Sequence, residues 1–299
     1  PCRRPCPGRP ALEPIAPPPA ASPHPPLSPQ RPFSVGEILD AAFDLVRRNA
    51  ALLVGLSALV HIPAAFATAG LPAPAENGGA APEPAGWLVA ALALSLVALP
   101  IVLAALTDAC GALLRGAPVD AGTALRRGLA LALPLLGTLL VFALVLMGAL
   151  LPLGLVSLVW SSLPGPVRVA AALGAGLIPL VVMLRLSLLT QVAVLEEVFG
   201  PRALARAHEL IEGHVLRVFG IMALVAFLMT LLSGAVSIAL DPLAGVGPIA
   251  AGLAQAVAFA YTTAVGVVLY RDVRLRRGEG DAPGPAAVPP PWLPPPPLG

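Results

Sequence analysis

The sequence contains no lysine, few charged residues and few cysteines, and each shortage excludes a class of protein. Charged residues make up 11% of the 299 positions while 57% are hydrophobic, and soluble proteins average about 25% charged. A single aqueous core stops growing near about 250–300 residues. The absence of lysine excludes a phosphate-binding P-loop, and Cys2, Cys6 and Cys110 are too few and scattered for a disulfide framework. We therefore expect a protein whose solvent is lipid.

Proline is abundant at both ends of the chain. Residues 1–33 hold thirteen prolines, and residues 278–299 repeat this composition, with Trp292 standing among prolines. Such segments are predicted to be disordered arms, either plain linkers or, around Trp292, a docking peptide. The N-terminal arm lacks the apolar middle of a secretory signal, so we expect no cleavage. The membrane domain is then expected over residues 34–277.

Six apolar stretches lie between the arms, and each reaches the ~20 residues that a helix needs to cross a ~30 Å hydrocarbon core. They cover 50–70, 86–107, 129–160, 167–195, 218–240 and 247–270. None of them alternates with a period of two, which excludes a transmembrane barrel. The predicted fold is therefore all-α: a polytopic membrane protein of six transmembrane helices with juxtamembrane amphipathic helices.

Arginine placement predicts the orientation of this bundle. Arginines flank one set of span ends, at positions 47, 48, 115, 126, 127, 202, 206, 217, 271, 274, 276 and 277. The opposite loops, 71–85, 161–166 and 241–246, hold none, and only Arg168 lies just beyond one of them. By the positive-inside rule, both termini face the cytoplasm in the inner (plasma) membrane. Trp87 and Trp160 then fall at outer span ends, where indole rings prefer the headgroup level.

An amphipathic helix is predicted before the first span. Ser34-Val35-Gly36-Glu37 matches a capping box. Apolar and charged residues then separate with a helical period onto two faces. The apolar face carries Val35, Ile38, Leu39, Ala42 and Val46, and the charged face carries Glu37, Asp40, Asp44, Arg47 and Arg48. We expect this helix to lie in the interface plane with its apolar face in the headgroup boundary.

Two further segments resemble this helix in pattern. Gly200-Pro201 starts one whose apolar stripe lies opposite the polar residues Arg202, Arg206, Glu209 and Arg217, and a shorter one covers 118–127. An order of interfacial helix, span, outer loop and returning span thus occurs three times and suggests a repeat of hairpins. Such helices usually anchor the chain, and a minority bind partners or sense lipid.

Arg185 is the one charged residue expected deep inside a span. It lies ten residues before Leu195, or ~15 Å along a helix, and a charge at that depth should face the bundle or a partner. Asp108, at the inner end of the second span, is the expected partner, and Gln191 would extend a polar track. The alternative is a snorkelling arginine, if the fourth span ends near residue 184 and residues 186–195 lie shallower.

No motif in the sequence supports catalysis or metal binding. In His208-Glu209-Leu210-Ile211-Glu212 the second histidine of a zinc-protease motif is replaced by Glu212. The alternatives for Glu209 and Glu212 are a hard-cation site together with His208 or a solvated face that pairs with Arg206, and we favour the solvated face. No G-x-S-x-G elbow occurs, and the four histidines are dispersed. Small residues at four-residue spacing, Ala170/Gly174 and Gly252/Ala256, predict close helix contacts. We expect no cofactor, no metal and no nucleic-acid partner.

Three stretches resemble the bacterial family known as the membrane domain of glycerophosphoryl diester phosphodiesterases. They are 31–48, with Gly36-Glu37-Ile38-Leu39-Asp40, then 194–219, and 269–277. The resemblance covers 31–280, and departs where the family often has Ser-Trp and this chain has Ala207-His208, which suggests that His208 fills a packing position. Nothing matches the catalytic barrel that some members carry. The resemblance implies a stand-alone, non-catalytic six-span protein linked to membrane lipid or glycerophosphodiester metabolism.

Two functions follow from this reading. The first is a membrane scaffold or accessory module whose cytoplasmic helices and proline-rich arms engage protein partners or lipid headgroups. The second is a small transporter or channel with a polar path through Arg185, Asp108 and Gln191, although no inverted repeat of broken helices is evident.

Overall fold

The computed structural model describes residues 32–69, 86–158, 164–240 and 247–279, and every regular element in these ranges is an α-helix. The helices are α1 (Val35–Arg48), α2 (Ala50–Ala69), α3 (Gly86–Leu114), α4 (Ala121–Leu158), α5 (Gly165–Arg185), α6 (Leu189–Leu195), α7 (Pro201–Ile211), α8 (Val215–Leu240) and α9 (Gly247–Arg276). The prediction of an all-α protein with long apolar helices is confirmed. The predicted arms lie almost wholly outside the described residues, as do Trp160, Trp292 and the side chain of Trp87.

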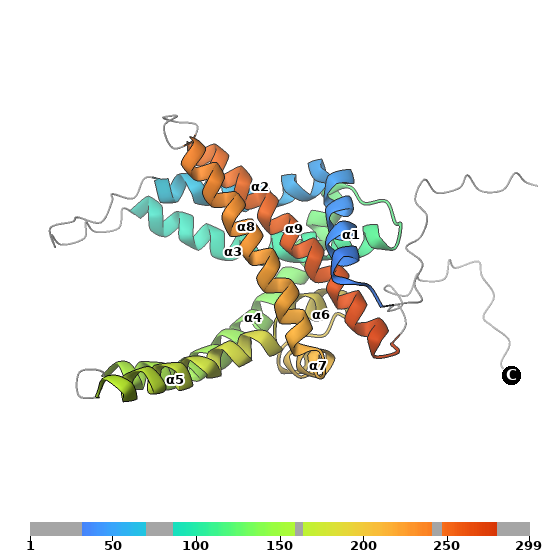
Figure 1. Cartoon of the computed structure of the whole chain (residues 1–299). Helices are drawn as coiled ribbons and strands as arrows, with labels where there is room; N and C mark the ends of the chain where they lie inside the picture. The colour runs from blue at the N-terminus through green and yellow to red at the C-terminus, as the bar shows by residue number, and fades with distance from the viewer. Residues whose placement is uncertain (1–31, 70–85, 159–163, 241–246, 280–299) are drawn as a thin grey trace, which may run out of the picture.

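The long helices form three antiparallel hairpins, α2 with α3, α4 with α5, and α8 with α9 (Figure 1). Helix α9 packs along α2, and α3 packs along α4, so the first hairpin joins the other two. The short helices α1, α6 and α7 gather at one end of the molecule, together with the start of α8 and the end of α9. We call this end the arginine-rich end. The α4–α5 hairpin diverges from the other two hairpins away from it.

Five segments of the described chain are long and apolar enough to cross a membrane. Helix α2 adds a sixth when it is taken together with α1, from which it is bent by 87°. Many large apolar side chains of the diverging hairpin are exposed, including Leu133, Leu140, Leu144, Met147, Leu151, Leu173 and Leu177. Such a surface suits contact with lipid tails and not with water. The number of spans stays a prediction.

Helix α4 is longer than predicted, because the short helix expected at 118–127 is its first part. Asp120 caps its start: the carboxylate accepts hydrogen bonds from the Thr123 backbone N–H at 2.9 Å and from its hydroxyl at 2.6 Å. These bonds hold the pKa of Asp120 below its usual value. Gly128 does not end the helix but lets α3 approach, since a Cβ there would lie 2.5 Å from the Ile101 carbonyl oxygen. The third interfacial helix was therefore a wrong prediction.

The segment predicted as one span over 167–195 contains a break. Helix α5 ends at Arg185, residues 186–188 form a turn, and α6 begins at Leu189. Neither Gly nor Pro stands at the break, so the sequence carries no signal for it. Arg185 therefore lies at the end of a helix, and Gly165–Leu195 as a whole still has the length and hydropathy of one span, so both predicted alternatives for Arg185 stay predictions.

Helix α1 begins as predicted, with both hydrogen bonds of the capping box between Ser34 and Glu37. Its apolar face, however, is buried against protein. Ile38 and Ala42 are fully buried, and α1 packs on α9. The expectation that this face rests among lipid headgroups is wrong, because α9 covers it.

The space around two glycines shows which of the predicted helix contacts are close. A Cβ at Gly252 in α9 would lie 2.9 Å from the Ile62 Cα in α2, and Ala256, one turn on, is fully buried. This pair makes the close contact predicted for it. Gly174 in α5 has no atom within 4 Å of such a Cβ, and Ala170 is exposed, so the contact predicted there is wrong among the described residues.

Candidate functional site at the arginine-rich end

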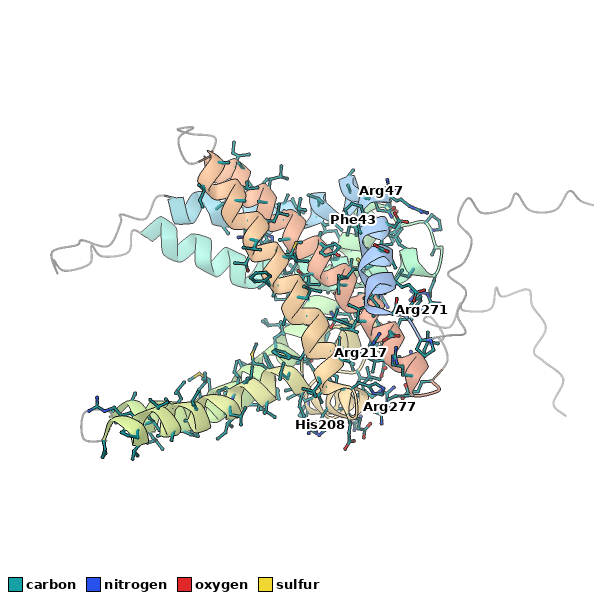
Figure 2. All side chains as sticks on the ribbon, viewed as in Figure 1. Phe43, Arg47, His208, Arg217, Arg271 and Arg277 are labelled. Atoms are coloured by element: carbon teal, nitrogen blue, oxygen red, sulfur yellow. The ribbon has the colours of Figure 1, made fainter. Side chains whose placement is uncertain are left out.

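Arginines and carboxylates from helices α3, α4, α7, α8 and α9, and from the residues after α6 and α9, meet at the arginine-rich end. Figure 2 shows Arg217, Arg271, Arg277 and His208 there. The arginines lie near the ends of apolar helices, where long side chains reach past the apolar surface to polar partners. Most of these partners are distant in sequence. The site consists of three separate ion clusters.

The first cluster, which we call the N-terminal clasp, is built on Asp272. This carboxylate is fully buried and accepts hydrogen bonds from the Phe33 backbone N–H at 2.7 Å, from Arg217 at 3.3 Å and from Arg276 at 2.9 Å. Both guanidinium groups also donate to the Phe33 carbonyl oxygen, Arg276 at 3.0 Å. The clasp thereby fixes the backbone at the start of α1 to the last turns of α9 and the first turn of α8.

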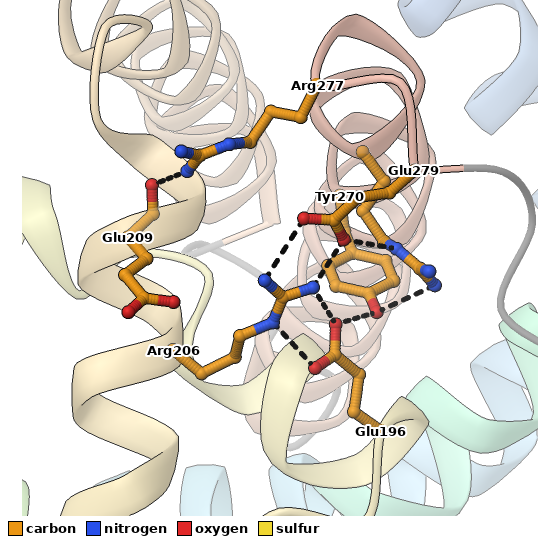
Figure 3. A network of polar contacts seen from close by, with 7 residues as sticks. Glu196, Arg206, Glu209, Tyr270, Arg277 and Glu279 are labelled. Carbon is orange, nitrogen blue, oxygen red and sulfur yellow. Dashed lines mark hydrogen bonds and ion pairs between the residues drawn. The ribbon is translucent and has the colours of Figure 1, made fainter.

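The second cluster, the C-terminal clasp, holds the chain just beyond α9 (Figure 3). Arg206 of α7 donates to Glu196 at 2.9 Å and 3.2 Å, and to Glu279 at 3.1 Å. Arg274 donates to Glu279 at 3.3 Å, and the Tyr270 hydroxyl donates to Glu196 at 2.7 Å. One arginine thus bridges two carboxylates that lie on different parts of the chain.

The charges of the C-terminal clasp stabilise one another. The hydrogen bond from Arg206 lowers the pKa of the Glu279 carboxyl, and the bond to Glu279 raises the pKa of Arg206. Both groups lie outside the apolar segments. Because each pKa is displaced away from neutrality, both groups stay charged over the physiological range and the clasp stays closed.

A third cluster joins α3 and α4 to the residues after α6. Arg127 lies 3.8 Å from the Asp108 carboxylate and also pairs with Glu197. Glu197 has a positive φ of 55°, a backbone conformation that residues other than glycine rarely adopt. The chain turns there toward Gly200, whose N–H donates to the Thr138 hydroxyl of α4 at 2.8 Å. This cluster sets the direction in which α7 starts.

The three residues predicted to form an intramembrane path do not contact one another. Asp108 pairs with Arg127, whereas the Arg185 guanidinium lies 3.1 Å from the Nε2 atom of His208. The predicted Asp108–Arg185 pair is therefore wrong. Gln191 is buried, and its amide oxygen has no hydrogen-bond partner in the described chain. Its amide group packs against Gly266, at the place that a Cβ atom would occupy if this residue were not glycine.

The residues predicted as interfacial divide into two groups. Glu37 caps α1, Asp40 is exposed, and Arg47 and Arg48 pair with Asp44 at 3.2 Å and 2.9 Å as local surface contacts. Arg206, in contrast, turns away from the polar face of α7 and into the C-terminal clasp. The side chain of Glu209 forms no ion pair in the described chain, although its carbonyl oxygen accepts a hydrogen bond from Arg277. His208 is exposed, so the packing role predicted for it is wrong.

Sequence reasoning missed Tyr270, Asp272 and Glu279 as parts of the site. The signal for Asp272 was present, because it stands four residues before Arg276 and among arginines at a span end. Nothing in the sequence pairs Glu279 with Arg206, which is 73 residues away. In the described ranges, no group of three or more His, Cys, Asp or Glu side chains is arranged to hold a metal ion.

Fold and site together define a helical protein with membrane-type helices and an ion-paired polar end. No family model matches the chain, and neither a curated protein nor a solved structure gives a significant match. The clusters consist of charges paired with charges. Their evident physical effect is to hold distant backbone segments together.

Proposed function

We propose that the protein is a non-catalytic scaffold of the bacterial inner (plasma) membrane that presents two proline-rich segments from one cytoplasmic platform. The observation that carries this proposal is the pair of clasps. Phe33, which follows the first proline-rich segment, is bonded to Asp272, and Glu279, which precedes the second, is bonded to Arg206 and Arg274. Both segments therefore leave the molecule beside the last two turns of α9.

The arginine excess supports the cytoplasmic placement of this platform. Twelve arginines flank the span ends that meet at the arginine-rich end, while Arg168 alone lies near the opposite loops. Arginine in short loops is retained on the cytoplasmic side during insertion. Both proline-rich segments then reach the compartment where soluble partners are available.

Two proline-rich segments held side by side favour a partner with two matching grooves. Proline-rich peptides bind aromatic-lined grooves at little entropic cost, because proline already restricts the chain. Once one segment is bound, the second binds intramolecularly, and avidity exceeds either single affinity by a factor of about a hundred or more. A rigid platform supports this gain, since it fixes the distance between the two starting points.

A capture experiment tests the scaffold. The full chain in detergent is compared with chains in which residues 1–30, residues 281–299 or both are replaced by Gly/Ser segments of equal length. We expect partners identified by quantitative mass spectrometry to weaken with either replacement and to disappear with both. An unchanged set of partners in the double replacement would contradict the proposal, because the membrane domain alone would then account for binding.

The resemblance of 31–48, 194–219 and 269–277 to the phosphodiesterase-associated membrane domains suggests where such a scaffold acts. We place it as an accessory module in membrane lipid or glycerophosphodiester metabolism. Deleting the gene should change the cellular amounts of glycerophosphodiesters or of their parent lipids. The deletion strain is compared with a strain in which the gene has been restored. Equal amounts in the two strains would contradict the link to lipid metabolism but not the scaffold proposal.

A further inference from the structure

Arg185 and His208 form a polar pair outside the clasps. Arg185 is the last residue of α5, and its guanidinium lies 3.1 Å from Nε2 of His208 on α7. His208 is exposed and Arg185 is half-buried, so the pair is open to the surroundings. The imidazole nitrogen must accept from the guanidinium, so the contact uses no negative charge.

The pair differs in this respect from the five arginines of the ion clusters. Carboxylates lie within 4 Å of Arg127, Arg206, Arg217, Arg274 and Arg276. The only polar partner that the described chain gives Arg185 is the imidazole. Neither Glu209 nor Glu212, both on or beside α7, forms an ion pair with it. A guanidinium and an imidazole without a carboxylate are the donor set of an anion site.

Apolar surface adjoins the pair on the membrane side. In the last two turns of α5, Leu180, Val181 and Met183 are exposed, and Leu216, at the start of α8, is 83% exposed. Helices α5 and α7 are packed together, as are α5 and α8. The pair thus stands where lipid-suited surface gives way to the arginine-rich end. A bilayer whose headgroups meet this boundary would place the pair at the level of the lipid phosphates.

We propose that Arg185 and His208 bind the phosphate group of an anionic membrane lipid, whose acyl chains lie along the exposed face of α5. The guanidinium offers two parallel donors to the phosphate oxygens, and the imidazole donates from Nε2 in the matching tautomer. Binding replaces the Arg185–His208 contact with two charge-assisted bonds. This inference rests on the membrane setting of the proposed function but not on the proline-rich segments.

Native mass spectrometry of the full chain in detergent, titrated with phosphatidylglycerol, tests the site. Arg185→Gln should weaken binding about tenfold, as expected for one lost charge-assisted interaction, and His208→Asn should weaken it by a smaller factor. Arg126→Gln is the matched control, because Arg126 is exposed and, among the described residues, its side chain donates only to the Gly122 carbonyl oxygen. We expect it to leave binding unchanged.

Three outcomes would overturn the proposal. Equal losses in Arg126→Gln and Arg185→Gln would show a general charge effect without a site. Equal affinity for phosphatidylcholine would show that the site does not distinguish an anionic lipid from a zwitterionic one. Displacement of phosphatidylglycerol by an equal concentration of inorganic phosphate would assign the site to a soluble anion. His208→Asn, an exposed change, keeps the test valid if Arg185→Gln fails to fold, and none of these results depends on capture by the proline-rich segments.

Discussion

Asp272 is the fully buried carboxylate of the arginine-rich end. It is fully buried, yet it is surrounded by one backbone N–H and two guanidinium groups, which replace the water that a carboxylate requires. Arg217 and Arg276 remain about a quarter exposed, so water still reaches them. The carboxylate is therefore the group for which the protein provides all of the solvation.

Asp272→Asn should destabilise the protein by about 2–3 kcal/mol. The change removes the charge between two arginines, and breaking a fully buried pair costs about 3–5 kcal/mol, which is reduced here because the arginines keep some solvent. Thermal unfolding in detergent measures the loss. Asp44→Asn is the control, since its pairs with Arg47 and Arg48 are exposed and worth about 0–1 kcal/mol. Equal effects of the two changes would contradict the role of burial.

Glu279 makes the stability of the C-terminal clasp depend on pH. Its pKa is lowered in the folded protein by the bond from Arg206, so its contribution is present above the unfolded value of about 4.5. The contribution is lost as the pH falls through the lower folded value. Glu279→Gln should therefore reduce stability by about 1 kcal/mol at pH 7, and the difference from the wild type should vanish under acid.

Melting curves of the two proteins in detergent across this range provide the measurement. Glu209→Gln is the control, because the Glu209 carboxylate has no ion pair in the described chain and should give a small difference at any pH. If the difference in melting temperature between Glu279→Gln and the wild type persists unchanged in acid, the clasp depends on the shape of the Glu279 side chain and not on its charge.

Some side-chain contacts could be predicted from the sequence and others could not. The Ser34 cap and the Asp44–Arg48 pair follow from spacings of three and four along one helix, so they could be predicted. The partners of Arg206 and Arg185 depend on where α7 lies, which is set by the break at 186–188 and the positive φ of Glu197. Neither feature has a local sequence signal, so the predicted Arg185 partner was wrong.

At the scale of the helices, close approach at a glycine joins α4 to α3 and α9 to α2 but, in the described chain, not α5 to a neighbour. Gly252 allows α9 to lie against α2, and the packing of α1 on α9 closes the same region. Helix α5 has no comparable contact at Gly174. The helices themselves could be predicted, because apolar length and caps are local properties, whereas their contacts could be predicted only where small residues face a neighbour.

Gly252→Ala should destabilise the protein by about 1–3 kcal/mol. The new methyl group would lie 2.9 Å from the Ile62 Cα, and backbone cannot yield as a side chain does. Gly174→Ala is the matched control and should be neutral or stabilising by up to about 1 kcal/mol, since alanine favours a helix and the position is open. Thermal unfolding of both variants in detergent tests this, and a stabilising Gly252→Ala would disprove the contact.

At the scale of the whole molecule, polar and apolar surfaces are divided between the two ends. The clasps occupy the arginine-rich end, and the exposed leucines of α4 and α5 extend away from it. The sequence predicts this division through arginine placement alone. The divergence of the α4–α5 hairpin could not be predicted, because an apolar helix that faces lipid and one that faces protein have the same composition.

Site-directed labelling tests the orientation. In a chain whose three cysteines are replaced by serine, a cysteine at position 77 or 241 should react with a membrane-impermeant maleimide in intact cells. A cysteine at position 126 should react only after lysis, because the arginine-rich end is expected inside. The reverse pattern would place the proline-rich segments outside the cell and end the scaffold proposal.

The bond from Phe33 to Asp272 joins positions 239 residues apart. A ribosome adds about 5–20 residues per second, so α1 leaves the exit tunnel about 10–50 s before the helix that covers it exists. During that interval the nascent chain displays Ile38 and Ala42 uncovered. Until α9 has been synthesised, the apolar face of α1 must therefore be covered by another apolar surface, either that of the insertion machinery or that of the bilayer.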